Sequence, residues 1–289
     1  MRFWVRPLMK KYSLPIASFL ILFCLSEQSL AQYDPAQNSP ADLVKQIAKN
    51  ELADRVQQLK YTYCVDKSNG GHTLTGKQVE TKEGPLFRLL LIDHGSLSSE
   101  QIKQDSIRRD LVLKDARLRK KLKNDHDEDE QKLQRLIGIL PGAFLYDFAG
   151  KQGNLLTLKF RPNPGYSPTT YEMRVAHQLQ GTIIVDAQQK RLIKMSGALL
   201  APVDFGFGIL GHVEKGGKLE IVRTQVAPGH WKTSLINIQM DGRILIFKTV
   251  NKQQYEVRYR FENVPGDFSL QQAQTLLLSN APSPLCSAL

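Results

Sequence analysis

Apolar and polar residues alternate along two stretches in the last third of the chain. In residues 236–241 the apolar positions are separated by uncharged polar or acidic residues, and in residues 255–262 they are separated by charged residues. Successive side chains of a strand point to opposite faces of a sheet, so this period of two predicts strands with one apolar and one solvated face. The candidate ligand-binding residues on that apolar face are Ile236, Ile238, Met240, Tyr255, Val257, Tyr259 and Phe261.

Further strands are predicted on both sides of the chain's midpoint. Residues 144–148 and 156–160 show the same alternation, and runs rich in aromatic and branched residues predict strands at 61–65, 86–92 and 218–226. Turn signals rich in Gly, Pro and Asp divide the second half of the chain into hairpins of antiparallel strands. These signals lie at 186–190, 216–217, 228–229 and 241–242.

Three other segments predict helices. Ser39 and Pro40 supply an N-cap and a first helical residue, and apolar residues then recur at helical spacing from Leu43 to Leu59. Residues 98–140 are dense in charged residues and leucine and end at Pro141-Gly142, which predicts one long helix or two helices. A short helix is expected at 269–278. The first of these helices should bury one face.

The order of these elements predicts the class of the fold. A helix precedes the first strands, the long charged helix follows them, and a meander of strands completes the chain. This order favours a single α+β domain over residues 32–289, with the charged segment at about 98–140 as a helical insertion. We expect a curved antiparallel sheet, a half-barrel, with helices packed on its concave apolar face.

The first 31 residues predict a cleavable secretory signal peptide. A basic stretch is followed by an apolar core over residues 14–25, which is shorter than the roughly 20 residues that a transmembrane helix needs. Small residues at Ser29 and Ala31 predict cleavage after Ala31. An acylated Cys24 is the alternative, but Phe23 stands where lipidation requires a small residue. We therefore expect a periplasmic or secreted protein with no transmembrane segment in the mature chain.

Cysteines and charge narrow the choice of compartment and partner. Cys64 and Cys286 remain after cleavage, and an oxidising compartment would permit a disulfide, although nothing in the sequence brings them together. The mature chain would hold 35 basic and 27 acidic side chains, a net charge of +8. Residues 151–260 contribute sixteen basic and seven acidic residues to this count, so anionic partners are favoured. Nothing in the sequence predicts nucleic-acid binding.

Motifs for catalysis, metals and cofactors are weak. The stretch Gly206 to Gly211 matches the dinucleotide pattern G-x-G-x-x-G, but a turn and a strand follow it where the pyrophosphate would need a helix. The acidic run 125–130 lacks the glycine and spacing of a calcium loop, and the six histidines stand singly. No nucleophile signature is present. We therefore predict no enzyme activity, no metal site and no cofactor.

The hairpin sequence Gly181-Thr182-Ile183-Ile184-Val185-Asp186 with Arg191 to Met195 resembles that of the LolA/LolB-type lipoprotein carriers. More closely, the chain resembles secreted bacterial members of that superfamily with sequences like Phe205 to Gly211 and Gly229-His230-Trp231. The resemblance covers about residues 140–289. It implies a half-closed barrel whose concave apolar face is lidded by helices and accepts acyl chains. The charged helix departs from the carrier pattern, and no functional residue of the carriers is transferred.

The sequence thus predicts an exported envelope protein that binds a lipid, a lipoprotein acyl chain or another apolar ligand in a cavity between sheet and helices. Its partners would be a lipid or an acylated protein, or an anionic membrane surface. The alternative is an envelope sensor or scaffold that binds another protein, followed by an unrecognised hydrolase. An apolar pocket would favour the carrier. A filled core with an exposed patch on the surface would favour the scaffold.

Overall fold

A computed structural model describes most of the chain after residue 38, and the described residues form one compact unit. The described residues are 39–56, 59–69, 71–205, 211–244, 248–249, 252–279 and 286. The predicted signal peptide, with its cleavage site after Ala31, lies outside them. Residues 206–210 of the glycine-rich stretch lie outside them as well.

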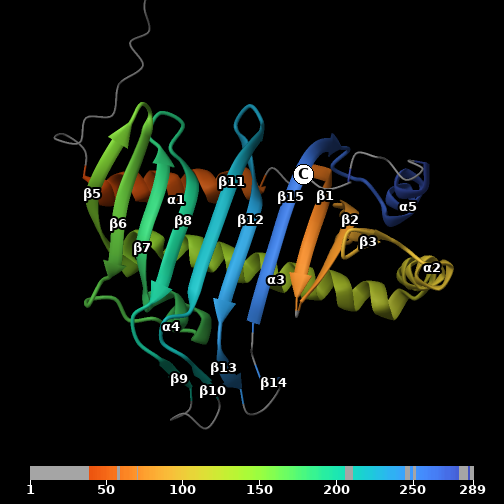
Figure 1. Ribbon diagram of the computed structural model, residues 1–289. Helices are drawn as coiled ribbons and strands as arrows, with labels where there is room; N and C mark the ends of the chain where they lie inside the picture. The colour runs from red at the N-terminus through yellow and green to blue at the C-terminus, as the bar shows by residue number, and fades with distance from the viewer. Residues whose placement is uncertain are drawn as a thin grey trace, which may run out of the picture. The chain divides into compact units, whose positions relative to one another are not determined.

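Within the described residues, eleven strands form one antiparallel sheet in the order β4-β3-β2-β1-β15-β12-β11-β8-β7-β6-β5. The α+β class and the large antiparallel sheet are therefore confirmed, and the sheet is open, with β4 and β5 at its edges (Figure 1). The strands are β1 (Lys60–Asn69), β2 (His72–Val79), β3 (Leu86–Ile92), β4 (Gly95–Ser96), β5 (Phe144–Gln152), β6 (Leu155–Pro162), β7 (Leu179–Asp186), β8 (Arg191–Leu199), β11 (Lys218–Ala227), β12 (His230–Met240) and β15 (Lys252–Val264).

The first and last strands of the chain lie next to each other in this sheet. Lys60 of β1 pairs with Val264 of β15, and Ser68 pairs with Tyr255. The predicted turns at 186–190 and 228–229 join the neighbouring pairs β7–β8 and β11–β12. The hairpins β1–β4 and the meander β5–β12 thus meet through β15.

Close packing between β7 and β8 explains two glycines. Gly181 and Gly197 are paired across these strands, and a Cβ on Gly181 would lie 1.9 Å from the carbonyl oxygen of Ser196. No side chain fits there without moving backbone.

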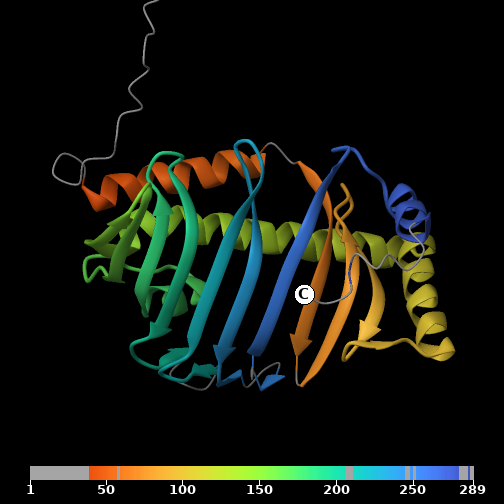
Figure 2. The ribbon, with the colours of Figure 1, turned by 45° about the horizontal axis from the view of Figure 1, so that its top comes forward.

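Helices α1 (Pro40–Val56) and α3 (Ala116–Ala143) lie on the same side of the sheet, and α3 runs across it behind the strands (Figures 1 and 2). We call this side the inner face and the opposite side the outer face. Helices α2 (Ser99–Lys114) and α5 (Leu270–Ser279) lie beside β3 at one end of the sheet, and α4 (Tyr171–His177) follows β6. The sequence did not predict α4.

The charged segment forms two helices, one of the two alternatives predicted. Asp115 separates them, because it ends α2 and its carboxylate accepts hydrogen bonds from the first amides of α3. Helix α3 continues past Pro141 to Ala143, beyond the predicted end. Its last carbonyls are satisfied by Asn163, whose side chain donates to Gly142 at 2.8 Å and whose amide donates to Ala143 at 2.9 Å.

The main core lies between α1 and the strands β5–β8. Leu43, Val44 and Ile47 of α1 are buried, which confirms the predicted apolar face of this helix, and they pack with residues such as Leu156 and Leu158. A second core joins α2 and α5 to β2 and β3. The main core lies at the β5–β8 end of the inner face, and the second core lies at the β3 end of the sheet.

Cys64 and Cys286 form a disulfide. Cys64 pairs with Tyr259 in the β1–β15 register, and the Tyr259 hydroxyl donates to the Cys286 carbonyl at 3.4 Å. This bond decides the question that the sequence left open, and it attaches the end of the chain to the centre of the sheet.

A small second sheet contains β9 (Val203–Phe205), β10 (Gly211–Val213), β13 (Gly242–Ile244) and β14 (Lys248–Thr249). In it, His212 Nδ1 lies 2.6 Å from Asp204 Oδ1, and its Nε2 lies 3.3 Å from Glu214 Oε2. The hydrogen bond that His212 donates to Asp204, followed by the one to Glu214, raises the pKa of His212.

Candidate functional site

A cavity of about 620 Å³ lies between the inner face and α3. Its wall is formed by residues of β1, β2, β11, β12 and β15 on the sheet side, by α3 opposite them, and by the last turn of α1. Much of this wall is charged. The basic residues are Arg55, Lys60, Lys82, Lys123, Arg223, Lys232 and Arg258, and the acidic ones are Asp54, Glu80, Asp127 and Glu130.

Buried ion pairs form the wall at the end of α1. Glu51, one helical turn before Arg55, is 3% exposed, and its Oε2 lies 2.5 Å from Nη1 of the buried Arg223. Arg191 approaches both acids of α1, at 3.7 Å from Glu51 and 3.4 Å from Asp54. Burial lowers the pKa of Arg223, and the charge of Glu51 partly offsets that effect. These contacts fix α1 to β8 and β11.

The hairpin between β11 and β12 is held by the same helix. Asp54 accepts a hydrogen bond from the Trp231 amide at 3.0 Å and lies 2.8 Å from His230 Nδ1. The Trp231 carbonyl accepts from Arg223 Nη2 at 2.7 Å. Arg55 connects α1 to α3 through a 2.7 Å ion pair with Glu130. Trp231 is therefore fixed on both sides of its backbone.

The opposite wall combines ion pairs with aromatic rings. Lys232 Nζ lies 2.8 Å from Glu80 Oε2 and 4.9 Å from the centre of the Tyr61 ring. Arg258 lies over the Tyr63 ring and pairs with the buried Glu256. Burial raises the pKa of Tyr63, so its hydroxyl stays protonated and accepts a hydrogen bond from Gln78.

Three buried N–H donors in this wall have no hydrogen-bond partner in the part of the chain that the structure describes. They are Arg55 Nε, Arg223 Nε and Trp231 Nε1. A buried donor without an acceptor costs about 1–3 kcal/mol, so such groups call for a physical explanation.

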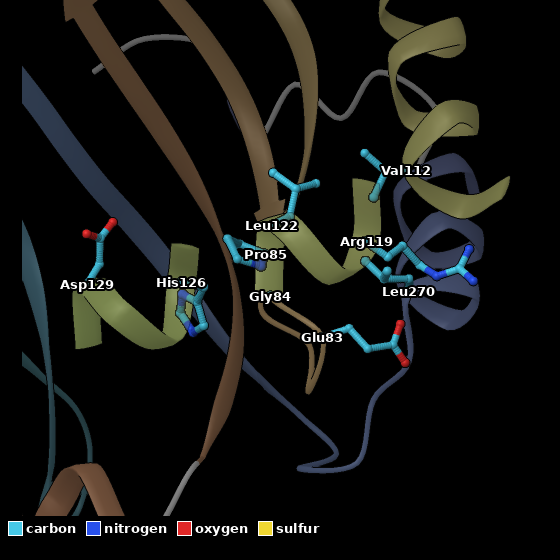
Figure 3. A pocket seen from close by; sticks show the side chains of 9 residues that line it. All are labelled: Glu83, Gly84, Pro85, Val112, Arg119, Leu122, His126, Asp129 and Leu270. Carbon is cyan, nitrogen blue, oxygen red and sulfur yellow. The ribbon is translucent and has the colours of Figure 1, made fainter. Parts of the chain in front are cut away.

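A smaller cavity of about 190 Å³ adjoins the first (Figure 3). Leu122 of α3, Val112 of α2 and Leu270 of α5 surround it together with the turn at Gly84-Pro85. Pro85 and His126 belong to the walls of both cavities. The space under α3 therefore continues toward α5, where its lining becomes more apolar.

The structure divides the predicted apolar face between the two sides of the sheet. Ile236 lines the cavity, Ile238 shares its face by alternation, and Met240 packs against the main core, so these three lie on the inner face. The β15 residue opposite Ile236 is Glu256, which is buried, and Arg258 also lines the cavity.

Tyr255, Val257 and Tyr259 consequently lie on the outer face, and Tyr255 is 47% exposed. Phe261 returns to the inner face and contacts Tyr61 and Tyr63, because a bulge shifts the β1–β15 register beside Arg260. The placement of Tyr255, Val257 and Tyr259 on the helix-facing side is therefore corrected. The expectation failed because the inner face is polar at this point, so the charged residues of β15 face inward.

The residues that dominate this wall were not selected from the sequence. Glu51 and Asp54 occur within an ordinary amphipathic helix pattern, which gives neither of them a separate signal. Among the described residues, no group of three or more His, Cys, Asp or Glu could hold a metal ion. In the acidic run, Asp127 pairs with Lys123 at 2.5 Å.

No family model, curated protein or solved structure matches this chain. Across the described residues, none of the helices combines the length and the apolar character needed to cross a bilayer.

Proposed function

We propose that this chain is an exported, non-enzymatic binding protein that holds an amphiphilic ligand in the cavity between the inner face and α3. The cavity volume of about 620 Å³ carries the proposal. Ligand sites typically have volumes of about 300–1,000 Å³. The ligand would enter as a lipid or as the acyl chain of a lipoprotein, consistent with the resemblance to the LolA/LolB-type carriers.

The wall argues for an amphiphile rather than a purely apolar molecule. Leu59, Leu133, Ile236 and the ring of Trp231 offer apolar surface. The charged groups between them would lose water without compensation if only hydrocarbon filled the space, and such desolvation is costly. A ligand with one polar end and one apolar end satisfies both parts of the wall.

Export is supported by two independent features. The first is the signal peptide pattern of residues 1–31. The second is the disulfide between Cys64 and Cys286, since such bonds persist in oxidising compartments and are rare in the cytosol. We propose a periplasmic or secreted location on this basis.

Titration of fluorescent fatty acids tests the proposed function. Protein lacking residues 1–31 should bind them saturably, and affinity should rise with chain length because each buried methylene contributes about 0.8 kcal/mol. Four additional methylenes should therefore strengthen binding by about 3 kcal/mol. Mass spectrometry of solvent extracts from natively purified protein should detect the bound amphiphile.

Two neighbouring substitutions serve as a matched pair. Ile236→Ser places a hydroxyl in the cavity wall and should reduce the chain-length dependence, whereas Leu235→Ser lies on the outer face and should not. Circular dichroism establishes that both variants fold. Equal binding by both variants would refute this location. Absence of saturable binding at every chain length would refute the carrier proposal and favour a protein-binding scaffold.

A further inference from the structure

We propose that the α1 end of the cavity is an anion subsite, formed by Arg55, Arg223 and Trp231, that takes a phosphate or carboxylate group. The inference deepens the proposed function, because it assigns the ligand's polar end to these residues. The same chemistry would also accept a free phosphate ion, and the experiment below distinguishes the two.

The charge of the wall favours an anion over a cation. Seven basic and four acidic side chains line the cavity, and two of the basic ones, Arg223 and Arg258, pair with the buried acids Glu51 and Glu256 behind the lining, so the wall is positive by less than three charges. The acids at this end already have cationic partners, since Asp54 contacts Arg191 and Glu130 contacts Arg55. A cationic ligand would have to displace one of them. An anion adds the missing negative charge in a region partly shielded from water, where charge interactions are stronger than in bulk solvent.

The hydrogen-bonding groups point to the same conclusion. Arg223 uses Nη1 for Glu51 and Nη2 for the Trp231 carbonyl, and its Nε has no partner among the described residues. Arg55 Nη1 forms the ion pair with Glu130, and Arg55 Nε also has no hydrogen-bond partner among the described residues. The indole Nε1 of Trp231 is a third such donor. All three groups can donate a hydrogen bond but cannot accept one. Oxygen atoms of a ligand would therefore accept these hydrogen bonds, either directly or through a water molecule.

These donors are held in place before any ligand binds. Arg223 is 8% exposed and bonded to both α1 and β12, and the backbone of Trp231 is bonded on one side to Asp54 and on the other to Arg223. Groups that are already ordered lose little conformational entropy on binding, which increases affinity and selectivity. Phosphate and carboxylate are the anions that arginine recognises best, through charge-assisted hydrogen bonds.

Intrinsic fluorescence reports directly on this subsite. The sequence contains two tryptophans, at positions 4 and 231, so protein lacking residues 1–31 carries Trp231 alone. Inorganic phosphate should change the Trp231 emission saturably. A lysophospholipid with a phosphate monoester head should bind at least about tenfold more tightly than a fatty alcohol of the same chain length, because the alcohol cannot engage charged donors.

Substitutions at one ion pair separate anion binding from structure. Arg55→Gln should weaken phosphate binding by about tenfold, while Glu130→Gln removes the same ion pair but keeps the guanidinium and should leave binding equal or tighter. Arg161→Gln removes an exposed charge remote from the cavity lining and is the charge control. Trp231→Phe, followed by calorimetry, should also weaken binding because it removes the indole N–H.

The outcomes distinguish the two proposals. Saturable phosphate binding that is lost in Arg55→Gln but kept in Glu130→Gln and Arg161→Gln supports the subsite. Equal losses in Arg55→Gln and Arg161→Gln would overturn it, because they would indicate general charge attraction. Amphiphiles that bind without regard to head-group charge would overturn the subsite and leave the proposed function intact. Phosphate binding with no binding of any amphiphile would support the subsite and refute the carrier.

Discussion

Arg223→Met tests the role of the buried ion pair that fixes α1 to the sheet. The side chains of Arg223 and Glu51 are 8% and 3% exposed, and their closest atoms are 2.5 Å apart. At an effective dielectric constant of 20, charges at this distance attract by about 7 kcal/mol. Desolvation of the two ions opposes this attraction by several kcal/mol for each ion.

The single substitution removes the attraction but leaves Glu51 buried. Arg191 remains 3.7 Å from Glu51, and its positive charge still offsets part of the buried negative charge of Glu51. We therefore expect the free energy of unfolding to fall by about 3 kcal/mol, at the low end of the range for a broken buried pair. The double variant Glu51→Leu/Arg223→Met removes both charges at similar volume, and it should recover to within about 1 kcal/mol of the unsubstituted protein.

Urea unfolding followed by far-ultraviolet circular dichroism measures the stability of the unsubstituted protein, of the single variants Arg223→Met and Glu51→Leu, and of the double variant. The slope of the free energy against urea should be unchanged, so that midpoints report stability. A loss below about 1 kcal/mol in Arg223→Met would refute the burial of this pair. A double variant as unstable as the single one would show that the cost does not arise from an uncompensated Glu51.

Three further changes have defined outcomes. Replacing Cys64 and Cys286 by Ala should lower the free energy of unfolding by about 2–5 kcal/mol, because the bond spans 222 residues and restricts the unfolded chain; equal urea midpoints would contradict this. Gly181→Ala should lower the melting temperature sharply, since its Cβ would lie 1.9 Å from a backbone oxygen, whereas Gly150→Ala meets no neighbour within 4 Å and should change it far less. His212 has a raised pKa in the folded protein, so its contribution to stability is present below about pH 6.5 and is lost as pH rises through the folded value. His212→Gln should therefore be less stable than the unsubstituted protein at pH 5.5 and equal to it at pH 9, and a constant difference would contradict the assignment.

The elements of the fold were largely predictable because each one satisfies a local rule. The predicted strand at 86–92 coincides with β3, and the Ser39-Pro40 signal marks the start of α1. The exception at Pro141 has a physical cause, since Asn163, distant in sequence, satisfies the last carbonyls of α3. Local patterns could not include a partner that only the fold brings close.

The site was less predictable for the same reason. Alternation in β15 identified a strand but assigned its faces wrongly, because the rule assumes an apolar interior and Glu256 and Arg258 lie in a polar one. Glu51 gave no separate signal, since its partner Arg223 follows far along the chain. The basic surplus of residues 151–260 was the one feature that indicated an anionic ligand in advance.

The pairing of β1 with β15 has a consequence for the order of folding. Strand β1 obtains its neighbour β15 only when residues 252–264 are present, although β1 itself leaves the ribosome well before them. Closing so long a loop is slow, because its entropy must be lost before the strands gain contacts. The chain therefore cannot complete its sheet early in synthesis. The disulfide likewise can form only after β15 has been synthesised, because Cys286 follows that strand in the chain.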